Sequence, residues 1–540
     1  MAGRYRAEIV SGVGHRRMDT HSEICADVTM PMVKPTFDEP NEPLASIRVG
    51  DVALCERPDQ AHTPTQGVLS LPALTRQSAV NMAGGLISQA LKFLVVIYIA
   101  RQFSVPEFGF FSFAVAVNAY MFVVSNFGLP VFGSRAVAQS GSVSRELVTE
   151  ICWSRASLAL LGAVLATGIL ALVPGVSRME IQLVGIFGMS NLAQAGFFDW
   201  AFQGLHRQEI SAILNVIWQG GWLVLAIVSV RLGLGLRGVA MALFTSALIA
   251  STVGYFWLKQ ATSFQQAKND PRPLFRQSWE TLKGVAPLGW GAILLTVMVW
   301  TDTVWVRFLR GDSAVGIYAA GNRAGLALSM LGTFYVQGAF PLLSRVSEQA
   351  GSMFQHCFER VCSDLALIFI PGAIWSIAYA KEIIALVFLK AEYLAAVPVF
   401  SIFQVAMLLF IINNLLGTGV LVAFHRDQVF QRILAGTTAF FLILSPVLTW
   451  QWGLRGAAVA VLTSQTVSFL WFSFETRKFA QLNPSRVLLA PCLAGFATAA
   501  LARFLQLPFR FAIPALVLCY AVLMFWRAYG LHPKELESIG

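Results

Sequence analysis

The sequence predicts an all-α polytopic membrane protein, with about 14 transmembrane helices in two repeated six-helix lobes followed by two C-terminal helices. Two observations support this fold class. Of the 540 residues, 56% are hydrophobic and only 13% are charged, whereas soluble domains carry about 25% charged residues. Apolar runs of about 20 residues also alternate with short basic loops. Such a run crosses a hydrocarbon core of roughly 30 Å as a helix, because every backbone polar group in lipid must be paired within its own segment.

The apolar runs give the expected order of membrane spans and their orientation. Lys and Arg are more frequent in the loops on the side of the N-terminal tail, so the positive-inside rule places both termini in the cytoplasm. The expected spans cover residues 79–100, 109–132, 152–174, 180–203, 210–231, 237–257, 283–308, 316–343, 362–380, 394–422, 429–450, 456–474, 486–505 and 509–528.

Residues 1–75 differ from the rest of the chain. They contain prolines and mixed charges but no long apolar run. Such a segment buries too little apolar surface to fold, so it is predicted to be a disordered cytoplasmic tail. Without an apolar h-region it does not match a cleaved secretory signal. An alternative is that translation starts at an internal methionine, Met18, Met30 or Met32.

Charge and cysteine patterns argue against several classes of partner. The net charge of +10 is distributed over many loops instead of one face, which argues against nucleic-acid binding. No CxxC pair occurs, and Cys357 and Cys362 beside His356 are interpreted as ordinary residues near a helix end. There is no GxxxxGK[ST] loop for ATP. We therefore expect no metal and no cofactor.

An internal repeat is the most informative feature of the sequence. Residues 235–246 read GLRGVAMALFTS and residues 453–464 read GLRGAAVAVLTS. Upstream of each copy, His206-Arg207 matches His425-Arg426. Three ordered matches that include Arg, Gly and Pro are hard to ascribe to chance. The third joins spans 1–2 to spans 7–8, where Arg101, Phe108-Gly109, Pro130 and Arg135 match Arg307, Val315-Gly316, Pro341 and Arg345.

The repeat predicts the organisation of the membrane domain. A unit of six spans, an even number, gives both copies the same orientation, so they are related by an axis along the membrane normal with a site at their interface. The expected lobes are residues 76–260 and 261–480, and residues 481–540 add two transmembrane helices and a short tail. This arrangement favours a transporter that works by alternating access.

The residues also resemble a known family. The stretch from Ala100 to Arg135 and the segment DWAFQG at Asp199–Gly204 are similar to the polysaccharide flippases, the O-antigen and exopolysaccharide flippases of the multidrug/oligosaccharidyl-lipid/polysaccharide exporter superfamily. Asp302, followed by Val315-Gly316-Ile317-Tyr318, is similar to the second-lobe signature of that family. Asn126 stands where the family often has an acidic residue. The motif residues expected to have a structural role are Asp199, Trp200, Phe202, Gln203 and Gly204.

The resemblance implies a fold, an activity and partners. The fold would be a V-shaped pair of six-helix lobes with two further helices. The activity would be the flipping of an undecaprenyl-diphosphate-linked oligosaccharide, the repeat unit of a surface polysaccharide, across the bacterial inner membrane. The lipid-linked oligosaccharide, the bilayer and other polysaccharide-assembly membrane proteins would be the partners.

Ionisable and amide side chains inside the spans are the candidates for the substrate site. A charged group there is costly, so it is a functional candidate by default. Lys92 and Arg323 lie in repeat-related spans and are predicted to face a cleft that binds the diphosphate, with snorkelling toward an interface as the alternative. Asn126 and Asn322 are candidates for lining the cleft, or for hydrogen bonding between helices. Asp302 is expected to bind a coupling cation or to pair with Arg323.

Three other functions compete with this interpretation. A multidrug or cation exporter of the same superfamily would need acidic groups in its cavity, whereas the candidates here are mainly cationic. A lipid II flippase is closer, and only the Asp199–Gly204 motif argues against it. A membrane glycosyltransferase or polymerase would need carboxylates on a sizeable external loop, but the longest loop, near 258–282, is basic. The chain is therefore predicted not to be an enzyme.

Overall fold

The structure, a computed structural model, describes residues 71–261, 274–347, 351–480 and 484–506, with several more residues between 508 and 521. All regular structure within these ranges is helical, and eleven of the helices there are long and apolar enough to cross a membrane. This confirms the prediction of an all-α polytopic membrane protein. The predicted tail lies outside the described residues, except that its last residues begin the first helix at Leu71.

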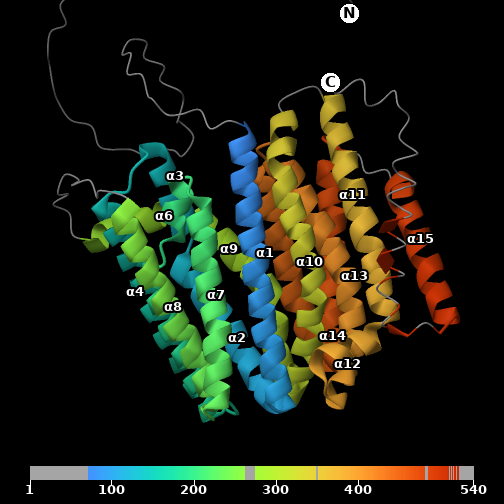
Figure 1. Cartoon of the computed structure of the whole chain (residues 1–540), viewed down its shortest axis with the longest axis horizontal. Coiled ribbons are helices and arrows are strands. Elements are labelled where there is room, and N and C mark those ends of the chain that lie inside the picture. Colours follow the sequence, from blue (N-terminus) through green and yellow to red (C-terminus); the bar gives the residue numbers. More distant parts are fainter. Residues whose placement is uncertain are drawn as a thin grey trace, which may run out of the picture. The chain divides into compact units, whose positions relative to one another are not determined.

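We call the helices before residue 262 the first half. They pack around α1 and α2, with α7 lying between α1 and α8, and with α4 and α5 against α2 (Figure 1). The predicted lobe boundary near residue 260 falls at the end of α8. The helices are α1 (Leu71–Gln102), α2 (Val105–Asn126), α3 (Leu129–Ser140), α4 (Arg145–Leu172), α5 (Arg178–Ala193), η1 (Gln194–Gly196), α6 (Asp199–Gly204), α7 (Gln208–Arg231) and α8 (Gly235–Ala261).

The second half repeats this plan around α9 and α10. Here α10 packs against α11 and α13, and α9 packs against α14. The helices are α9 (Leu274–Arg310), α10 (Asp312–Ser347), α11 (Gly351–Ala378), α12 (Ala380–Phe388), η2 (Ala391–Ala396), α13 (Val397–Asn414), η3 (Leu415–Val422) and α14 (Asp427–Thr476), followed by α15 (Pro484–Phe504).

Helix α14 contains two of the predicted spans. Its 50 residues would extend about 75 Å at about 1.5 Å per residue, far more than one membrane crossing. Gly453, with φ 59° and ψ −135°, interrupts the helix and separates the predicted spans 429–450 and 456–474. Predicted span 486–505 corresponds to α15, whereas most of span 509–528 lies outside the described residues. The total of 14 therefore stays a prediction.

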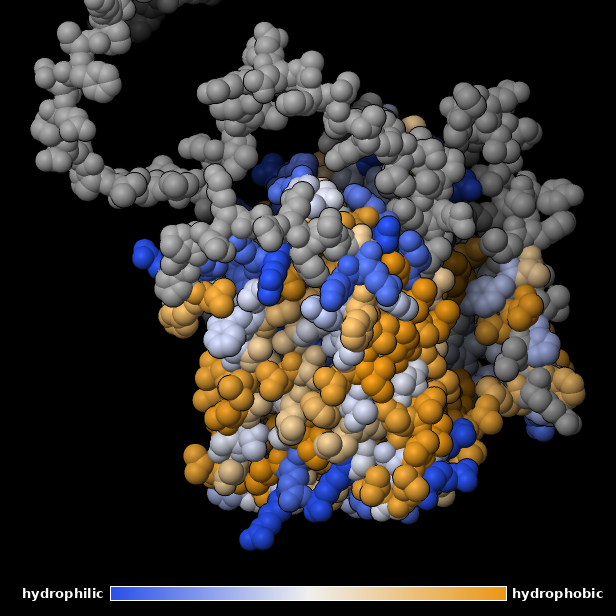
Figure 2. Space-filling view, turned by 60° about the vertical axis from the view of Figure 1, so that its left-hand side comes forward, coloured by the Kyte–Doolittle hydropathy of each residue, from blue (hydrophilic) through white to orange (hydrophobic). Residues whose placement is uncertain are grey.

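The surface between the two ends of the bundle is apolar. Figure 2 shows a broad hydrophobic band, with hydrophilic residues gathered at its two rims. Helix α4 contributes much to this surface, since Val164, Ile169 and Leu172 are all well exposed. Exposed aliphatic side chains at this density match a hydrocarbon environment, in which burial from water needs no protein partner.

Helix α15 docks on the second half through both charge and aromatic contacts. The guanidinium of Arg503 donates two hydrogen bonds to the carboxylate of Glu382 in α12, at 2.8 and 3.0 Å. These bonds hold the pKa of Glu382 below its usual value. Arg503 also lies over the ring of Tyr379, 4.2 Å from the ring centroid. The helix after the repeat is thus attached to the outside of the second half.

The structure reproduces the sequence repeat at the level of the backbone. His206 and His425 both adopt a left-handed conformation, with φ 57° and 54°. In each copy the next residue closes the turn, because Arg207 N–H donates to Phe202 O at 2.9 Å and Arg426 N–H donates to Leu421 O at 2.8 Å. The two segments that match in sequence thus also end their helices with the same turn.

The two halves touch through repeat-equivalent glycines where α2 crosses α10. A Cβ atom on Gly109 would lie 2.0 Å from the carbonyl oxygen of Asp312, and one on Gly316 would lie 2.3 Å from that of Val105. Residues 105 and 109 are the repeat equivalents of residues 312 and 316, so the contact is reciprocal. Reciprocal contacts of this kind are the signature of a two-fold axis. We call this end of the bundle the α1–α2 end.

Adding a methyl group at this crossing should destabilise the protein. We expect Gly109→Ala to lower the apparent melting temperature in detergent, because overpacking costs about 1–3 kcal/mol. Gly168 also lies within a helix, but a Cβ there would meet no neighbouring side chain or helix within 4 Å. Gly168→Ala should therefore leave the melting temperature equal or slightly higher. Fluorescence-detected size-exclusion chromatography after heating would measure both. Equal melting temperatures for the two variants would contradict the close approach.

Candidate functional site

Lys92 of α1 and Arg323 of α10 meet between the two halves. The helices that carry them are in contact, since a Cβ on Gly85 would lie 3.0 Å from the ring of Phe334. Both cations are half-buried, and each is close enough to repel the other's charge. Neither has a hydrogen bond or an ion pair with protein atoms among the described residues. The structure therefore brings the two predicted cations together and provides no protein anion in contact with them.

Arg323 is held by an aromatic ring instead of a carboxylate. Its guanidinium carbon lies 4.1 Å from the ring centroid of Trp300 on α9. Stacking on an indole attracts the cation through the ring quadrupole, and it leaves the N–H groups at the edge of the guanidinium available. Trp300 is itself half-buried. The arrangement offers a flat cationic group next to an aromatic face.

Asp302, two residues after Trp300, has its hydrogen-bonding capacity filled by neutral donors. It is 1% exposed, and one carboxylate oxygen accepts a hydrogen bond of 2.6 Å from Tyr318 Oη. The other oxygen accepts from the backbone N–H of Thr303 at 2.5 Å. Arg323 attracts this carboxylate electrostatically but is not within ion-pair distance of it in the described part of the chain. The expected Asp302–Arg323 contact is therefore replaced by neutral hydrogen bonds.

The two predicted asparagines have different surroundings from the cations. Asn322 is 5% exposed and its amide nitrogen lies 3.4 Å from Asp302 Oδ2, so it supports the carboxylate. Asn126 donates to Phe122 O of its own helix at 2.9 Å and is half-buried at the end of α2. No contact joins Asn126 to Lys92 or Arg323 among the described residues. The sequence identified these two amides as polar groups within the spans, but it did not indicate the hydrogen-bond partner of either amide.

A link between α2 and α9 beside this site was not predicted. Tyr120 Oη lies 2.5 Å from Thr301 Oγ1, the residue after Trp300. Neither residue is charged or part of a motif, so nothing in the sequence distinguished the pair. The bond joins the two halves directly next to the stacked Trp300 and Arg323.

The family motif forms a break in the fourth span. Helix α5 ends at Ala193, and the motif begins α6 at Asp199 after a short 3-10 turn. Trp200 and Phe202 are fully buried. Gly204 packs on α3, where a Cβ would lie 2.6 Å from Ser134 O. Gln203 Nε2 lies 3.4 Å from Asp199 Oδ2. Trp200, Phe202 and Gly204 thus pack α6 into the end of the bundle opposite the α1–α2 end.

Arg155 of α4 stabilises this break and was missed by sequence analysis. It is 3% exposed, and Nη1 donates to Phe197 O at 3.0 Å and to Ala195 O at 3.5 Å. Its charge attracts Asp199. The sequence feature that could have identified Arg155 is its position as an arginine near the start of an apolar span.

The described residues contain no group of three or more His, Cys, Asp and Glu side chains that could hold a metal ion. The site consists instead of two cations, an aromatic ring and a buried hydrogen-bonded carboxylate. Such a set suits an anion that carries an apolar or sugar face.

Residues 74–347 match the sequence model of a family described as polysaccharide biosynthesis protein. Searched against curated proteins, the chain has no significant match.

Three solved structures share the fold. A lipid II flippase, MurJ, in an inward closed conformation has a TM-score of 0.68 at 12% identity, covering 84% of this chain and 99% of its own. A superfamily transporter from Pyrococcus furiosus has a TM-score of 0.52 at 14% identity, covering 74% and 94%. The eukaryotic MATE transporter AtDTX14 has 0.52 at 13% identity, covering 78% and 98%.

Removal of the Arg155 side chain should disrupt the motif. Arg155→Ala leaves two buried carbonyls and Asp199 without their cation, which we expect to cost about 3–5 kcal/mol. The amount of folded protein and its melting temperature, both measured by size-exclusion chromatography, should fall. Arg145→Ala, which removes an exposed arginine from the start of the same helix, is the matched control. A melting temperature of Arg155→Ala equal to that of Arg145→Ala would rule out this role.

Proposed function

Because the chain belongs to the polysaccharide biosynthesis protein family, we propose that it flips an undecaprenyl-diphosphate-linked oligosaccharide from the cytoplasmic to the outer leaflet by alternating access. The observation that carries this proposal is the approach of Lys92 and Arg323 from opposite halves, with no protein anion in contact with either among the residues that the structure describes. The substrate would be the repeat unit of a surface polysaccharide, and the protein changes its location without changing its covalent bonds.

Electrostatics favours a diphosphate between these two cations. Two half-buried positive charges that repel each other destabilise the empty site, and an anion between them removes that penalty. The guanidinium of Arg323 can bind phosphate oxygens with two parallel hydrogen bonds, whereas Lys92 acts as a point charge. Because the cations belong to different halves, the bound anion would also draw the halves together.

Trp300 gives the site a surface for a sugar. When Arg323 moves toward a phosphate, the indole face that it covers becomes free for stacking. The hydrated glycan would then lie against an aromatic ring, and the polyprenyl chain would remain among lipid tails. An anionic group next to sugars and a lipid chain is the combination that a lipid-linked oligosaccharide presents.

The same site argues against the export of amphiphilic cations. A cation would meet two like charges, and Asp302, the carboxylate that attracts Arg323, is buried and accepts hydrogen bonds from Tyr318 and Thr303. We assign Asp302 a coupling role instead. Protonation or cation binding there would change the field at Arg323 and hence its affinity for phosphate.

The orientation of the chain follows from its loop charges. We propose that it lies in the bacterial inner membrane with both termini in the cytoplasm, which places the α1–α2 end at the outer face. The substrate would then be taken up from the cytoplasmic side, where lipid-linked precursors are made, and other polysaccharide-assembly membrane proteins would receive it at the outer face.

Deletion of the gene tests the substrate class. We expect undecaprenyl-linked repeat units to accumulate in extracted membrane lipids while surface polysaccharide disappears, and wild-type protein should restore both. Accumulation of lipid II instead would identify a peptidoglycan precursor as the substrate. Unchanged lipid intermediates, together with increased sensitivity to cationic drugs, would contradict the proposal and favour drug export.

The charge of Arg323 should control transport. In vesicles with a fluorescent diphosphate-linked oligosaccharide, we expect Arg323→Gln to reduce flipping at least about tenfold, since a charge-assisted hydrogen bond contributes about 1.5–3 kcal/mol. Arg323→Lys should retain part of the activity because it keeps the charge but not the paired hydrogen bonds. Arg231→Gln, an exposed arginine at the end of α7, is the control. Equal rates for Arg323→Gln and Arg231→Gln would exclude Arg323 from the site.

A further inference from the structure

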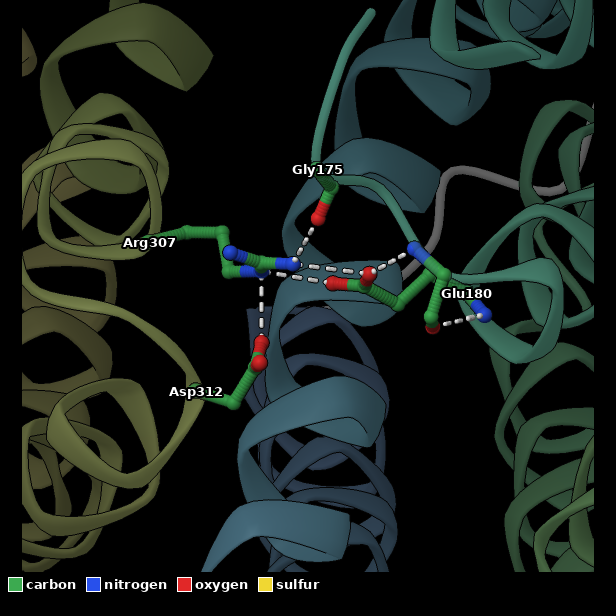
Figure 3. Close-up of polar contacts among 5 residues, drawn as sticks. Gly175, Glu180, Arg307 and Asp312 are labelled. Atoms are coloured by element: carbon green, nitrogen blue, oxygen red, sulfur yellow. Dashed lines mark hydrogen bonds and ion pairs between the residues drawn. The ribbon is translucent and has the colours of Figure 1, made fainter.

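Glu180, Arg307 and Asp312 form an ion-pair cluster at the α1–α2 end (Figure 3). Arg307 donates from Nε to Glu180 Oε1 at 2.7 Å and from Nη2 to Glu180 Oε2 at 2.9 Å. Nη2 also donates to Gly175 O at 3.0 Å. Asp312 Oδ1 lies 2.5 Å from Arg307 Nε. Two carboxylates therefore share one guanidinium.

The two carboxylates belong to different halves. Glu180 is in the first turn of α5, in the first half, whereas Asp312 begins α10 next to the end of α9, in the second half. Arg307, near the end of α9, is thus hydrogen-bonded across the interface to Glu180 and ion-paired within its own half with Asp312. When the halves separate at this end, the contact of Arg307 with Glu180 must break, whereas its contact with Asp312 can remain.

Glu180 is held rigidly for this contact. It is fully buried, and it completes a capping box in which Ser177 N–H donates to Glu180 Oε2 at 2.8 Å and Glu180 N–H donates to Ser177 Oγ at 3.2 Å. Its side chain therefore has little freedom to follow Arg307. A paired arginine and a fixed, buried carboxylate are strongly bound, because removal of either partner leaves an uncompensated charge.

The pseudo-symmetric contact on the other side has no carboxylate. Arg101, which the repeat relates to Arg307, donates to the carbonyls of Val387 and Leu386 at 2.7 and 2.9 Å. Lys390 in turn donates to Ala100 O at 3.2 Å. These bonds join the same two halves through neutral acceptors that water can replace. Among the described residues, the charged contact between the halves at this end therefore lies on the Arg307 side.

We propose that the cluster is a latch for the α1–α2 end, in which opening transfers Arg307 from Glu180 to Asp312. In the closed state Glu180 holds the second half through Arg307. When this end opens, Asp312 moves with Arg307 and remains as its counter-ion, so the arginine is never left unpaired. The two carboxylates consequently have opposite effects, because Glu180 favours the closed state and Asp312 favours opening. This inference concerns the conformational change and does not depend on the identity of the substrate.

Single-molecule FRET would test the latch in full-length protein in lipid nanodiscs. Dyes would be attached to cysteines introduced at Leu234 and Trp452, in a background without the seven native cysteines. These are repeat-equivalent positions, 56% and 60% exposed, at the α1–α2 end of each half. The distance between them reports separation of the halves, and neither residue contacts the cluster.

Substitutions that remove one charge each should give opposite results. We expect Glu180→Gln to raise the opening rate at least about tenfold, as loss of one partner of a buried pair implies, while glutamine preserves the capping box. Asp312→Asn should lower the opening rate, because the separated Arg307 then lacks a counter-ion. Arg178→Gln, an exposed arginine on α5 two residues from Glu180, should match the parent protein.

Three outcomes would overturn the proposal. They are equal opening rates for Glu180→Gln and Arg178→Gln, faster opening of Asp312→Asn, and an opening rate of Arg307→Gln equal to that of the parent protein. Retention volume and melting temperature would show that each variant is folded before its rates are compared. A cluster that only stabilised the fold would give a lower melting temperature without opposite changes in opening rate.

Discussion

The close approach of α2 and α10 at Gly109 and Gly316 constrains the rest of the molecule. Backbone atoms of one helix occupy the space that a side chain of the other would fill, so the two helices are fixed in both distance and register at this point. The reciprocal contact also fixes the two-fold relation between the halves. Helices α1 and α10 therefore lie side by side, which is why cations on these two helices, Lys92 and Arg323, meet. The site is a consequence of how the repeated units pack at one end.

The two-fold relation applies to the scaffold but not to its charges. Among the buried or half-buried arginines, Arg155 is satisfied by carbonyls and by the charge of Asp199, and Arg307 is satisfied by carboxylates. Arg323 stacks on an aromatic ring and is attracted by Asp302, but it has no hydrogen bond or ion pair among the described residues. An arginine inside a membrane protein has a structural role when protein carbonyls or carboxylates pair with it, because these partners offset the cost of its desolvation. An arginine whose N–H groups have no protein acceptor keeps them available for a ligand, and this difference separates the proposed substrate site from the structural sites.

The sequence predicted those features that depend on local composition and on repetition. Apolar runs specify helices in lipid, and the matched Gly, Arg and Pro positions specified the repeat and hence the meeting of Lys92 with Arg323. The partners of each polar group were not predictable. Asp302 is bonded to Tyr318 and Thr303 instead of Arg323, and Asp199 is attracted by Arg155, which the sequence did not single out. Which donor reaches a carboxylate depends on helix rotation and on rotamers, to which the hydrophobic pattern is insensitive.

One helix joins the latch to the site. Helix α9 carries Trp300 and Arg307, which are about 10 Å apart along its axis. The Tyr120–Thr301 bond lies beside Trp300, so α9 contacts the first half at both levels. A helix transmits displacement along its length because its backbone hydrogen bonds resist local deformation. Separation of Arg307 from Glu180 must therefore also move Trp300 relative to α1 and Lys92. Conversely, an anion that draws Arg323 away from Trp300 changes the packing of α9 two turns from the latch, and this provides a direct physical route by which occupancy of the site can control opening of the α1–α2 end.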